Sequence, residues 1–278
     1  GPVVSPTGIV YEAGTETKGG VAVPTSTTRG NEQAIDDLPF DRALLIKRTK
    51  RKAIPHNKFI ILLDNGRPIE VWTGSTNITA SGFLGQSNVG HIVRDEAIAA
   101  AFLRYWDLLS RDADLEAMRE FCSSNPADLT EPLQANSITA IFSPRRRSSM
   151  LDWYGKSIDR AQQTVMLTSA FGVTERLARY FNNDRDYLRF LLMEKPNASA
   201  ETQAMIERDR DTRIATGPDL NRDAIALQLE GAGLDFWLRE RHFRDRGGGH
   251  VFYIHTKIMA IDVLTDDPLV FSGSANFS

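Results

Sequence analysis

Residues 56–77 read HNKFIILLDNGRPIEVWTGSTN, and residues 255–276 read HTKIMAIDVLTDDPLVFSGSAN. Both stretches begin with His-x-Lys and end with Gly-Ser-x-Asn, and the spacing from the His to the Asn is 21 residues in each (77 − 56 and 276 − 255). The same residue types at one fixed spacing, found twice, indicate an internal repeat.

Each copy of the repeat is expected to fold as two strands joined by a turn. The strands are rich in apolar and β-branched residues, and Asn65-Gly66 in one copy and residues 266–268 in the other are typical of turns. An antiparallel hairpin places the start of one strand beside the end of its neighbour, so the His, Lys, Ser and Asn of a copy should converge. The predicted strands are 58–63 and 69–73 in the first copy, and 257–263 and 269–272 in the second.

The chain between the copies alternates between helical and extended patterns. Residues 94–121 have helical spacing, with Ile98, Phe102, Leu103 and Trp106 on one face. Such alternation predicts an α/β fold in which helices cover a mixed sheet. The other predicted elements are helices at 149–162, 173–182 and 222–230, and strands at 164–170, 187–193, 235–238 and 251–254.

The repeat divides the chain into two expected units, each a mixed β-sheet flanked by helices, which share one central active site. The first unit is 1–123, residues 124–137 form a linker rich in turn-forming residues, and the second unit is 138–278. The first His follows only 55 residues, and the second copy stops two residues after its Asn. We therefore expect a chain trimmed at both ends, or one naturally short unit.

The composition excludes several classes of protein. Of 278 residues, 41% are hydrophobic and the net charge is −3, which is incompatible with a mainly disordered chain. Cys122 has no partner for an intrachain disulfide, which fits a reducing compartment. Neither a signal peptide nor an apolar run of about 18 residues is present. These features predict a cytoplasmic protein without stable membrane insertion; the oligomeric state stays open.

Local clusters of cations predict a polyanionic partner. Residues 47–58 contain six Lys and Arg and no acid, and residues 239–246 are rich in Arg. Clefts respond to local rather than to net charge, so nucleic acid is the expected partner and substrate. The residues expected to line its groove are Lys50, Arg51, Lys52, Arg145, Arg244 and Arg246.

The repeated residue types suit chemistry at phosphorus. A neutral imidazole can attack phosphorus while a protonated one donates to the leaving oxygen, and Lys and Asn can bind the remaining oxygens. The motif lacks the carboxylate cluster that a hard cation requires, so neither a metal nor a cofactor is expected. The predicted catalytic residues are His56, Lys58, Asn77, His255, Lys257 and Asn276, with Ser75 and Ser274 supporting phosphate binding.

HNK…GSTN and HTK…GSANFS resemble the paired HxK…GSxN (HKD) motifs of the phospholipase D superfamily. Residues 142–171 also look like the opening of a unit of that family. The resemblance implies two units with one metal-independent active site and a phosphohistidine intermediate, as in the soluble bacterial-type nucleases of the superfamily. It implies that His56 attacks and His255 protonates the leaving group, although the sequence leaves the reverse open.

Two features depart from the family pattern. The family places an Asp five residues after the Lys, which Asp262 fits, but Asp64 comes one residue late and should point to the opposite face of its strand. The family also carries an acid after Gly-Ser-x-Asn that orients a His. This chain has Gln86-Ser87-Asn88 there, so either Gln86 or Ser87 substitutes, or the first site is weakened.

Three functions follow as alternatives. A nuclease or phosphodiesterase that hydrolyses DNA or RNA is favoured by the basic segments. A phospholipase D or phosphatidyl transferase would need an apolar lip, which the sequence does not show. A non-catalytic module that binds nucleic acid would agree with the displaced Asp64. Among the other histidines, His91 is expected to be structural, and His242 and His250 to lie in solvated loops.

Overall fold

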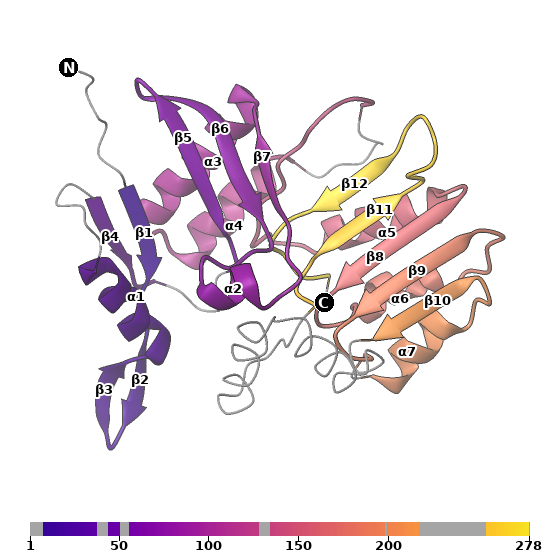
Figure 1. The fold of residues 1–278 in the computed structure, drawn as a ribbon, viewed down its shortest axis with the longest axis horizontal. Helices are drawn as coiled ribbons and strands as arrows, with labels where there is room; N and C mark the ends of the chain where they lie inside the picture. The colour runs from indigo at the N-terminus through magenta and orange to yellow at the C-terminus, as the bar shows by residue number, and fades with distance from the viewer. Residues whose placement is uncertain are drawn as a thin grey trace, which may run out of the picture.

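The computed structural model describes residues 8–37, 44–50, 56–127, 134–197, 199–216 and 254–277. This part of the chain forms a mixed α/β structure with four separate sheets (Figure 1). The predicted helix at 222–230 and strands at 235–238 and 251–253 lie outside the described residues, as does 128–133 of the predicted linker. In the described ranges, no helix is long and apolar enough to span a bilayer.

The largest sheet has five strands in the order β10-β9-β8-β11-β12. Strands β8, β9 and β10 are parallel, whereas β11 is antiparallel to both β8 and β12. Helices α5, α6 and α7 lie beside it (Figure 1). The bounds are β8 (Thr164–Ser169), β9 (Leu188–Met193), β10 (Thr212–Thr216), β11 (Ile258–Ile261), β12 (Leu269–Ser272), α5 (Ser149–Arg160), α6 (Glu175–Phe181) and α7 (Ala200–Glu207).

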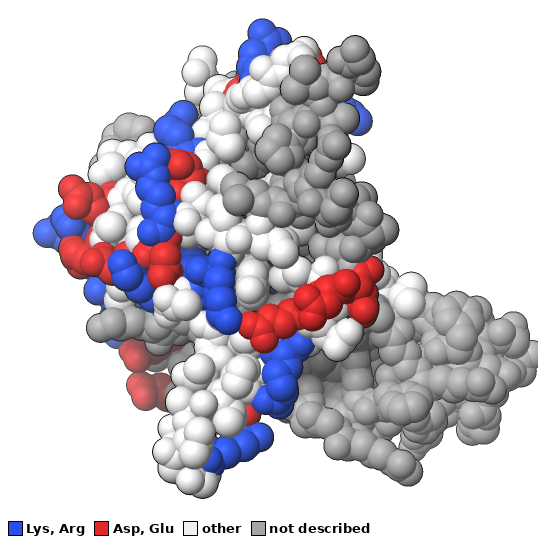
Figure 2. Space-filling view, turned by 90° about the vertical axis from the view of Figure 1, so that its left-hand side faces the viewer, with Lys and Arg blue, Asp and Glu red and all other residues white. Residues whose placement is uncertain are grey.

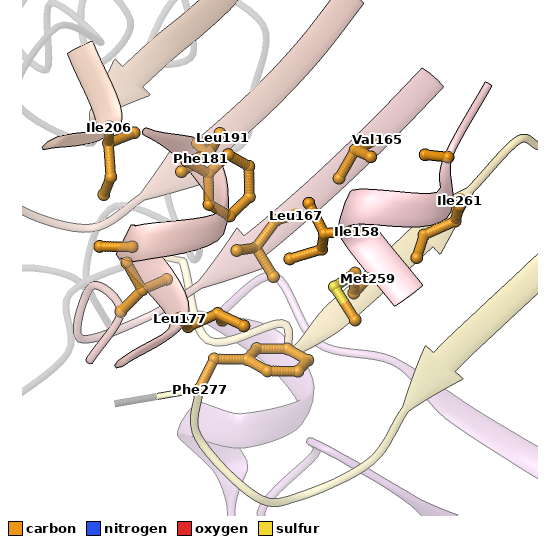
Figure 3. Close-up of a cluster of buried hydrophobic side chains, with 13 residues drawn as sticks. Ile158, Val165, Leu167, Leu177, Phe181, Leu191, Ile206, Met259, Ile261 and Phe277 are labelled. Atoms are coloured by element: carbon orange, nitrogen blue, oxygen red, sulfur yellow. The ribbon is translucent and has the colours of Figure 1, made fainter. Parts of the chain in front are cut away.

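A buried apolar cluster joins these helices to the large sheet. Val165 and Leu167 of β8, Met259 of β11 and Phe181 of α6 belong to this cluster (Figure 3). Phe277 joins the same cluster from the segment that follows β12, and it is only 6% exposed. Because Phe277 directly follows Asn276, burial of its ring fixes the end of the second repeat copy against the core.

A smaller antiparallel sheet, in the order β5-β6-β7, contains the first repeat copy. Its inner face packs on α3 through an aromatic cluster, in which the Phe59 and Phe102 ring centroids lie 5.2 Å apart. The rings of Tyr105 and Phe142 stack at 4.8 Å in the same cluster. The bounds are β5 (Phe59–Asp64), β6 (Arg67–Gly74), β7 (Gly90–Val93), α2 (Ala80–Leu84), α3 (Glu96–Ser110) and α4 (Leu115–Ser124).

The N-terminal part contains a parallel strand pair and a hairpin, elements that are not predicted from the sequence. Thr25 caps α1 by accepting a hydrogen bond from the backbone of Thr28, and Lys47 pairs with Glu32 at 2.8 Å. Bands of cationic and acidic side chains lie next to each other on this side of the molecule (Figure 2). The elements are β1 (Gly8–Glu12) paired with β4 (Leu44–Arg48), β2 (Thr15–Lys18) paired with β3 (Val21–Pro24), and α1 (Ser26–Asp36).

The single helix predicted over 94–121 is two helices, α3 and α4. Asp112 has a positive φ of 51°, and Asp114 caps α4 by accepting a hydrogen bond from the Ala117 backbone, so the chain turns between them. The predicted apolar face is also shifted. The fully buried residues of α3 are Ala99, Tyr105 and Leu109, while Ile98, Phe102, Leu103 and Trp106 are only half-buried.

The two repeat copies form the predicted hairpins, β5–β6 and β11–β12, but they belong to unlike sheets. One sheet has three antiparallel strands, and the other has five strands of mixed direction. The expectation of two equivalent units, each a mixed sheet, is therefore corrected. Hydrophobic alternation predicts a strand, but the number of strands in a sheet depends on partners that are distant in sequence.

Candidate active site

The His-x-Lys segments of both copies have the same local geometry. Each lies just before the first strand of its hairpin, and each Lys turns back toward its own His. The Nζ of Lys58 donates to the carbonyl oxygen of His56 at 2.6 Å, and the Nζ of Lys257 donates to the carbonyl oxygen of His255 at 2.5 Å. These bonds hold each ammonium group beside the backbone of the histidine that precedes it by two residues.

The second His-x-Lys segment lies against the loop between α2 and β7, which follows the first repeat copy. The backbone N–H of His255 donates to the Ser87 carbonyl at 3.1 Å, and the Thr256 hydroxyl donates to the same oxygen at 2.9 Å. Ser87 and Ile254 also form an isolated parallel bridge. Residues separated by about 170 positions in the chain are thus joined by several hydrogen bonds next to the second histidine.

Both histidines lie in the field of both lysines. The pKa of His56 is lowered first by burial and then by repulsion from Lys58 and Lys257. The pKa of His255 is lowered to about 4, by burial, by Lys257 and Lys58, and slightly by His56, while the Ser75 carbonyl opposes the shift. The two imidazoles and the two ammonium groups therefore lie close enough for their charges to repel one another, although nearly two hundred residues separate their motifs.

Burial also disfavours the charged lysines. The pKa of Lys58 falls to about 8 and that of Lys257 to about 7, mainly because the ammonium groups are removed from water. Lys257 is only 1% exposed and is further repelled by Lys58. Such a cluster of crowded, poorly hydrated cations would be stabilised by a bound anion with several negative oxygens.

Asn88 is the side chain that contacts His255, whereas the sequence pointed to Gln86 or Ser87. Its Oδ1 lies 2.8 Å from the His255 Nδ1. Ser87 contributes its backbone carbonyl instead, and the Gln86 side chain lies 3.4 Å from the Asn88 amide nitrogen. Sequence order alone does not show which of three neighbouring polar residues faces a ring from the other half of the chain.

Two buried polar atoms of the site have no hydrogen-bond partner in the part of the chain that the structure describes. They are the Nδ1 of His56 and the Oδ1 of Asn276. Unsatisfied buried polar atoms are rare in folded proteins, and they mark places where a ligand or water completes the bonding. Asn276 is held there because the carbonyl of Phe277 accepts a hydrogen bond from Thr174 at 3.0 Å.

The serines and Asn77 have different surroundings. Ser75 is fully buried, and its hydroxyl accepts from the Val89 backbone and donates to Asn88, both at 3.0 Å. Its predicted support of phosphate is therefore corrected to support of Asn88. Asn77 and Ser274 are half-buried next to the ends of β6 and β12, where the hairpins return toward their histidines.

The two motif aspartates have unlike roles. The carboxylate of Asp262 accepts hydrogen bonds from the backbones of Gln162, Gln163 and Thr164, at 2.8–3.1 Å, and so closes the turn between α5 and β8. Asp64 is exposed at the end of β5, where its Oδ1 accepts a bond from Asn65. In the described part of the chain, Asp64 therefore does not make the backbone contacts that Asp262 makes.

The predicted nucleic-acid groove is only partly described. Lys50 is exposed, whereas Arg145 donates to the carbonyls of Cys122, Ser123 and Pro126 and thereby holds the end of α4. Arg145 is thus corrected from a groove residue to a structural one. Arg51, Lys52, Arg244, Arg246, His242 and His250 lie outside the described residues, so the nucleic-acid partner stays a prediction.

His91 links the two sheets and lies outside the two repeated motifs. The Nε2 of His91 lies 2.8 Å from the Ser272 hydroxyl and so links β7 to β12, which agrees with the structural role expected for it. In the described ranges, no group of three or more His, Cys, Asp or Glu side chains is arranged to hold a metal ion.

Comparison with known proteins finds no matching family model and no matching curated protein. Among solved structures, the fold is similar to that of the polyphosphate kinase from Porphyromonas gingivalis, with a TM-score of 0.51 and 10% sequence identity. The match covers 97% of this chain and 36% of that protein. At this identity the likeness concerns the fold alone.

These findings correct two predictions. No family model supports membership of the phospholipase D superfamily, and a polyphosphate kinase is among the solved structures that have a similar fold. The expected nuclease, phosphodiesterase and hydrolase activities are contradicted together with that assignment. The physical reason is that a few short motifs fix where a phosphoryl group is held, but they do not fix which acceptor attacks it.

Proposed function

We propose that this chain is an enzyme of phosphoryl transfer that binds inorganic polyphosphate, or a similar phosphoanhydride chain, between its two His-x-Lys segments. The observation that carries the proposal is that Lys58, Lys257 and both imidazoles influence one another's charge, while hydrogen bonds to Ser87 and Asn88 hold His255 against the first half of the chain. The similarity of the fold to a polyphosphate kinase supports this substrate class. On this proposal the two repeat halves share a single site.

A polyphosphate chain fits the electrostatics of this site. It presents a dense row of negative oxygens. The oxygens of one phosphate unit can therefore face Lys58 while those of the next unit face Lys257. An adjacent negative charge raises the pKa of a lysine, and binding should therefore restore the full charge that burial removes from Lys257. Binding and protonation are then coupled, and the anion is taken up together with protons.

The residues also suit the transfer step. One imidazole nitrogen forms a bond to phosphorus, the bond from phosphorus to the departing oxygen breaks, and the other imidazole gives that oxygen a proton. The two ammonium groups and the amides of Asn77 and Asn276 stabilise the negative charge on the three oxygens that stay on phosphorus. Transfer to an acceptor oxygen reverses these steps and restores both rings.

The test is to incubate the protein with polyphosphate of defined length and a nucleoside diphosphate, and to follow both by ³¹P NMR. We expect new phosphoanhydride signals with the wild-type chain. Lys257→Ala should lose binding and transfer, while Lys18→Ala, in the exposed β2–β3 hairpin, is the matched control and should change neither. Absence of both binding and transfer in the wild type, or equal activity of Lys257→Ala, would contradict the proposal.

A further inference from the structure

The Asn88 amide is held in one orientation by its neighbours. Its Nδ2 donates to the carbonyl oxygen of Gly82 at 2.9 Å. The Ser75 hydroxyl accepts a bond from the Val89 backbone and therefore donates its own proton to the Asn88 Oδ1 at 3.0 Å. If the Asn88 amide were flipped, its N–H groups would face the Ser75 hydroxyl proton and its oxygen would face the Gly82 carbonyl oxygen. Both hydrogen bonds would then be lost.

This orientation determines where the proton of His255 lies. The Oδ1 of Asn88 is an acceptor, and it lies 2.8 Å from the Nδ1 of His255. The Nδ1 must therefore donate. A neutral imidazole carries one proton, so the Nε2 of His255 is left with its lone pair. His56 has no comparable constraint, since its buried Nδ1 has no partner in the described part of the chain.

We propose that His255, and not His56, accepts the transferred phosphoryl group, on its Nε2, and that Asn88 is the positioning residue that fixes the reactive tautomer. This rests on the proposed function. It reverses the order of roles that the sequence resemblance implied. Gly82 and the hydroxyl group of Ser75 act through Asn88.

The step balances as follows. The Nε2 lone pair forms a bond to the terminal phosphorus, and the bond to the bridging oxygen breaks. His56, as an imidazolium, gives its proton to that oxygen, and the phosphorylated His255 ring keeps the Nδ1 proton against Asn88. An acceptor oxygen then attacks phosphorus, the bond from Nε2 to phosphorus breaks, and the acceptor's proton passes to His56.

The groups facing His255 agree with this role. Lys257, Lys58 and His56 oppose a positive charge on the ring, and the Ser75 carbonyl favours one. Asn88 is uncharged, so it orients the ring without the attraction for a proton that a carboxylate would add. The buried Glu194 carboxylate accepts the backbone N–H of Ile254 at 2.7 Å and thereby fixes the residue before His255.

The first experiment locates the phosphoryl group. The protein is mixed with ³²P-labelled polyphosphate and quenched in base, and the labelled peptide is identified by mass spectrometry. We expect an acid-labile label on the peptide containing His255 in wild type, a much more slowly formed label on the same peptide in His56→Ala, and none in His255→Ala. A label on the peptide containing His56 would overturn the inference while leaving the proposed function intact.

Two other outcomes of that experiment are equally informative. Transfer without any labelled histidine would overturn the inference but not the proposed function. If the wild type neither binds nor transfers, the proposed function fails and the inference fails with it. The arms therefore separate the two claims.

A second experiment reads the tautomer without requiring activity. Long-range ¹H–¹⁵N NMR of protein labelled at its histidines should show the Nδ1–H form of His255 near neutral pH, and Asn88→Ala should abolish that preference. The His91 signals serve as the fold control. Asn88→Asp should keep the ring orientation and raise the pKa of His255. An Nε2–H form in the wild type would overturn the inference.

The same variants give a kinetic readout. Loss of one orienting hydrogen bond should lower the maximal transfer rate of Asn88→Ala by about tenfold or more, with little change in the polyphosphate concentration for half-maximal rate. Asn88→Asp should recover activity at higher pH, where the raised pKa of His255 no longer keeps the ring protonated. If Asn88 had a purely structural role, the transfer rates of both variants would be lowered equally at every pH.

Discussion

Lys257 is a cation with almost no contact with water. Its side chain is 1% exposed, its pKa falls to about 7, and the His255 carbonyl accepts its hydrogen bond. An ammonium group in this position opposes folding, because burial removes its charge from water. The same reasoning applies less strongly to Lys58, whose pKa falls to about 8.

The stability of the folded chain should therefore depend on the charge of Lys257. Because its pKa is lowered from 10.5 to about 7 on folding, the unfolded chain binds more protons between these values, and the free energy of unfolding should rise with pH across this window. Lys257→Met removes this contribution. Urea unfolding at several pH values compares the two proteins, and an equal slope for both would contradict the assignment.

Binding of polyphosphate should have the opposite pH dependence. As pH rises past about 7 and then about 8, Lys257 and Lys58 lose their protons in the free protein, so affinity should fall. The loss approaches about tenfold per pH unit for each lysine above its pKa. Titration calorimetry in buffers of different ionisation enthalpy measures both affinity and proton uptake. Affinity that is constant from neutral to alkaline pH would exclude these lysines as the binding cations.

The turn between α5 and β8 shows how one side chain closes a junction between elements. Asp262 lies directly after β11, in the left-handed region with φ of 52°, and its carboxylate satisfies three backbone N–H groups at the start of β8. Asp64 comes one residue later in the first copy. It is exposed at the end of β5, where its Oδ1 accepts a hydrogen bond from the Asn65 side chain.

Asp262→Ala should therefore lower the free energy of unfolding by about 1–3 kcal/mol, because it removes the acceptor of the partly buried Thr164 N–H and of the two exposed N–H groups before it. Asp64→Ala is the matched variant and should change the free energy by less than about 0.5 kcal/mol. Chemical denaturation of both proteins gives the comparison. Equal effects would show that the two motif aspartates are equivalent after all.

The strands of the repeat were predicted correctly because alternating apolar residues and turn formers are local signals. Residues 149–160, 164–169, 175–181 and 188–193 also form the elements expected of them. The break between α3 and α4 was missed, since Asp112 and Asp114 read as ordinary polar residues within a helical pattern. Their effect depends on a left-handed turn and on a cap, which appear only in the backbone geometry.

The whole molecule brings together two unlike sheets at one place. The Ser87–His255 contacts and the His91–Ser272 bond join the half that contains β5–β7 to the half that contains β8–β12. Neither half holds both histidines. If the site is shared as proposed, each half is inactive without the other.

Single substitutions distinguish one shared site from two independent sites. His56→Ala and His255→Ala should each lower the transfer rate by at least about 100-fold, since each removes an essential proton donor or phosphoryl acceptor. Two independent sites would instead leave about half of the activity in each variant. Steady-state rates, with circular dichroism as the fold control, decide between these cases.

A double-mutant cycle tests the same arrangement through binding. Lys58→Ala and Lys257→Ala should have non-additive effects on polyphosphate affinity, because the two ammonium groups repel each other and face one ligand. Affinity measured for both single variants and the double variant gives the coupling. Strict additivity would place the two lysines at separate sites.

Local patterns were sufficient to identify the repeat, its hairpins and the His and Lys residues whose charges influence one another, because strand periodicity and motif spacing are properties of neighbouring residues. The pairing of β8 with β11, the burial that lowers the pKa of Lys257 and the contact of Asn88 with His255 depend on residues far apart in the chain. Proximity of that kind arises from the packing of the folded chain. It also changes the role proposed for His255: the order of the motifs marked it as the acid, whereas the contact with Asn88 holds its proton on Nδ1 and leaves Nε2 free to accept the phosphoryl group.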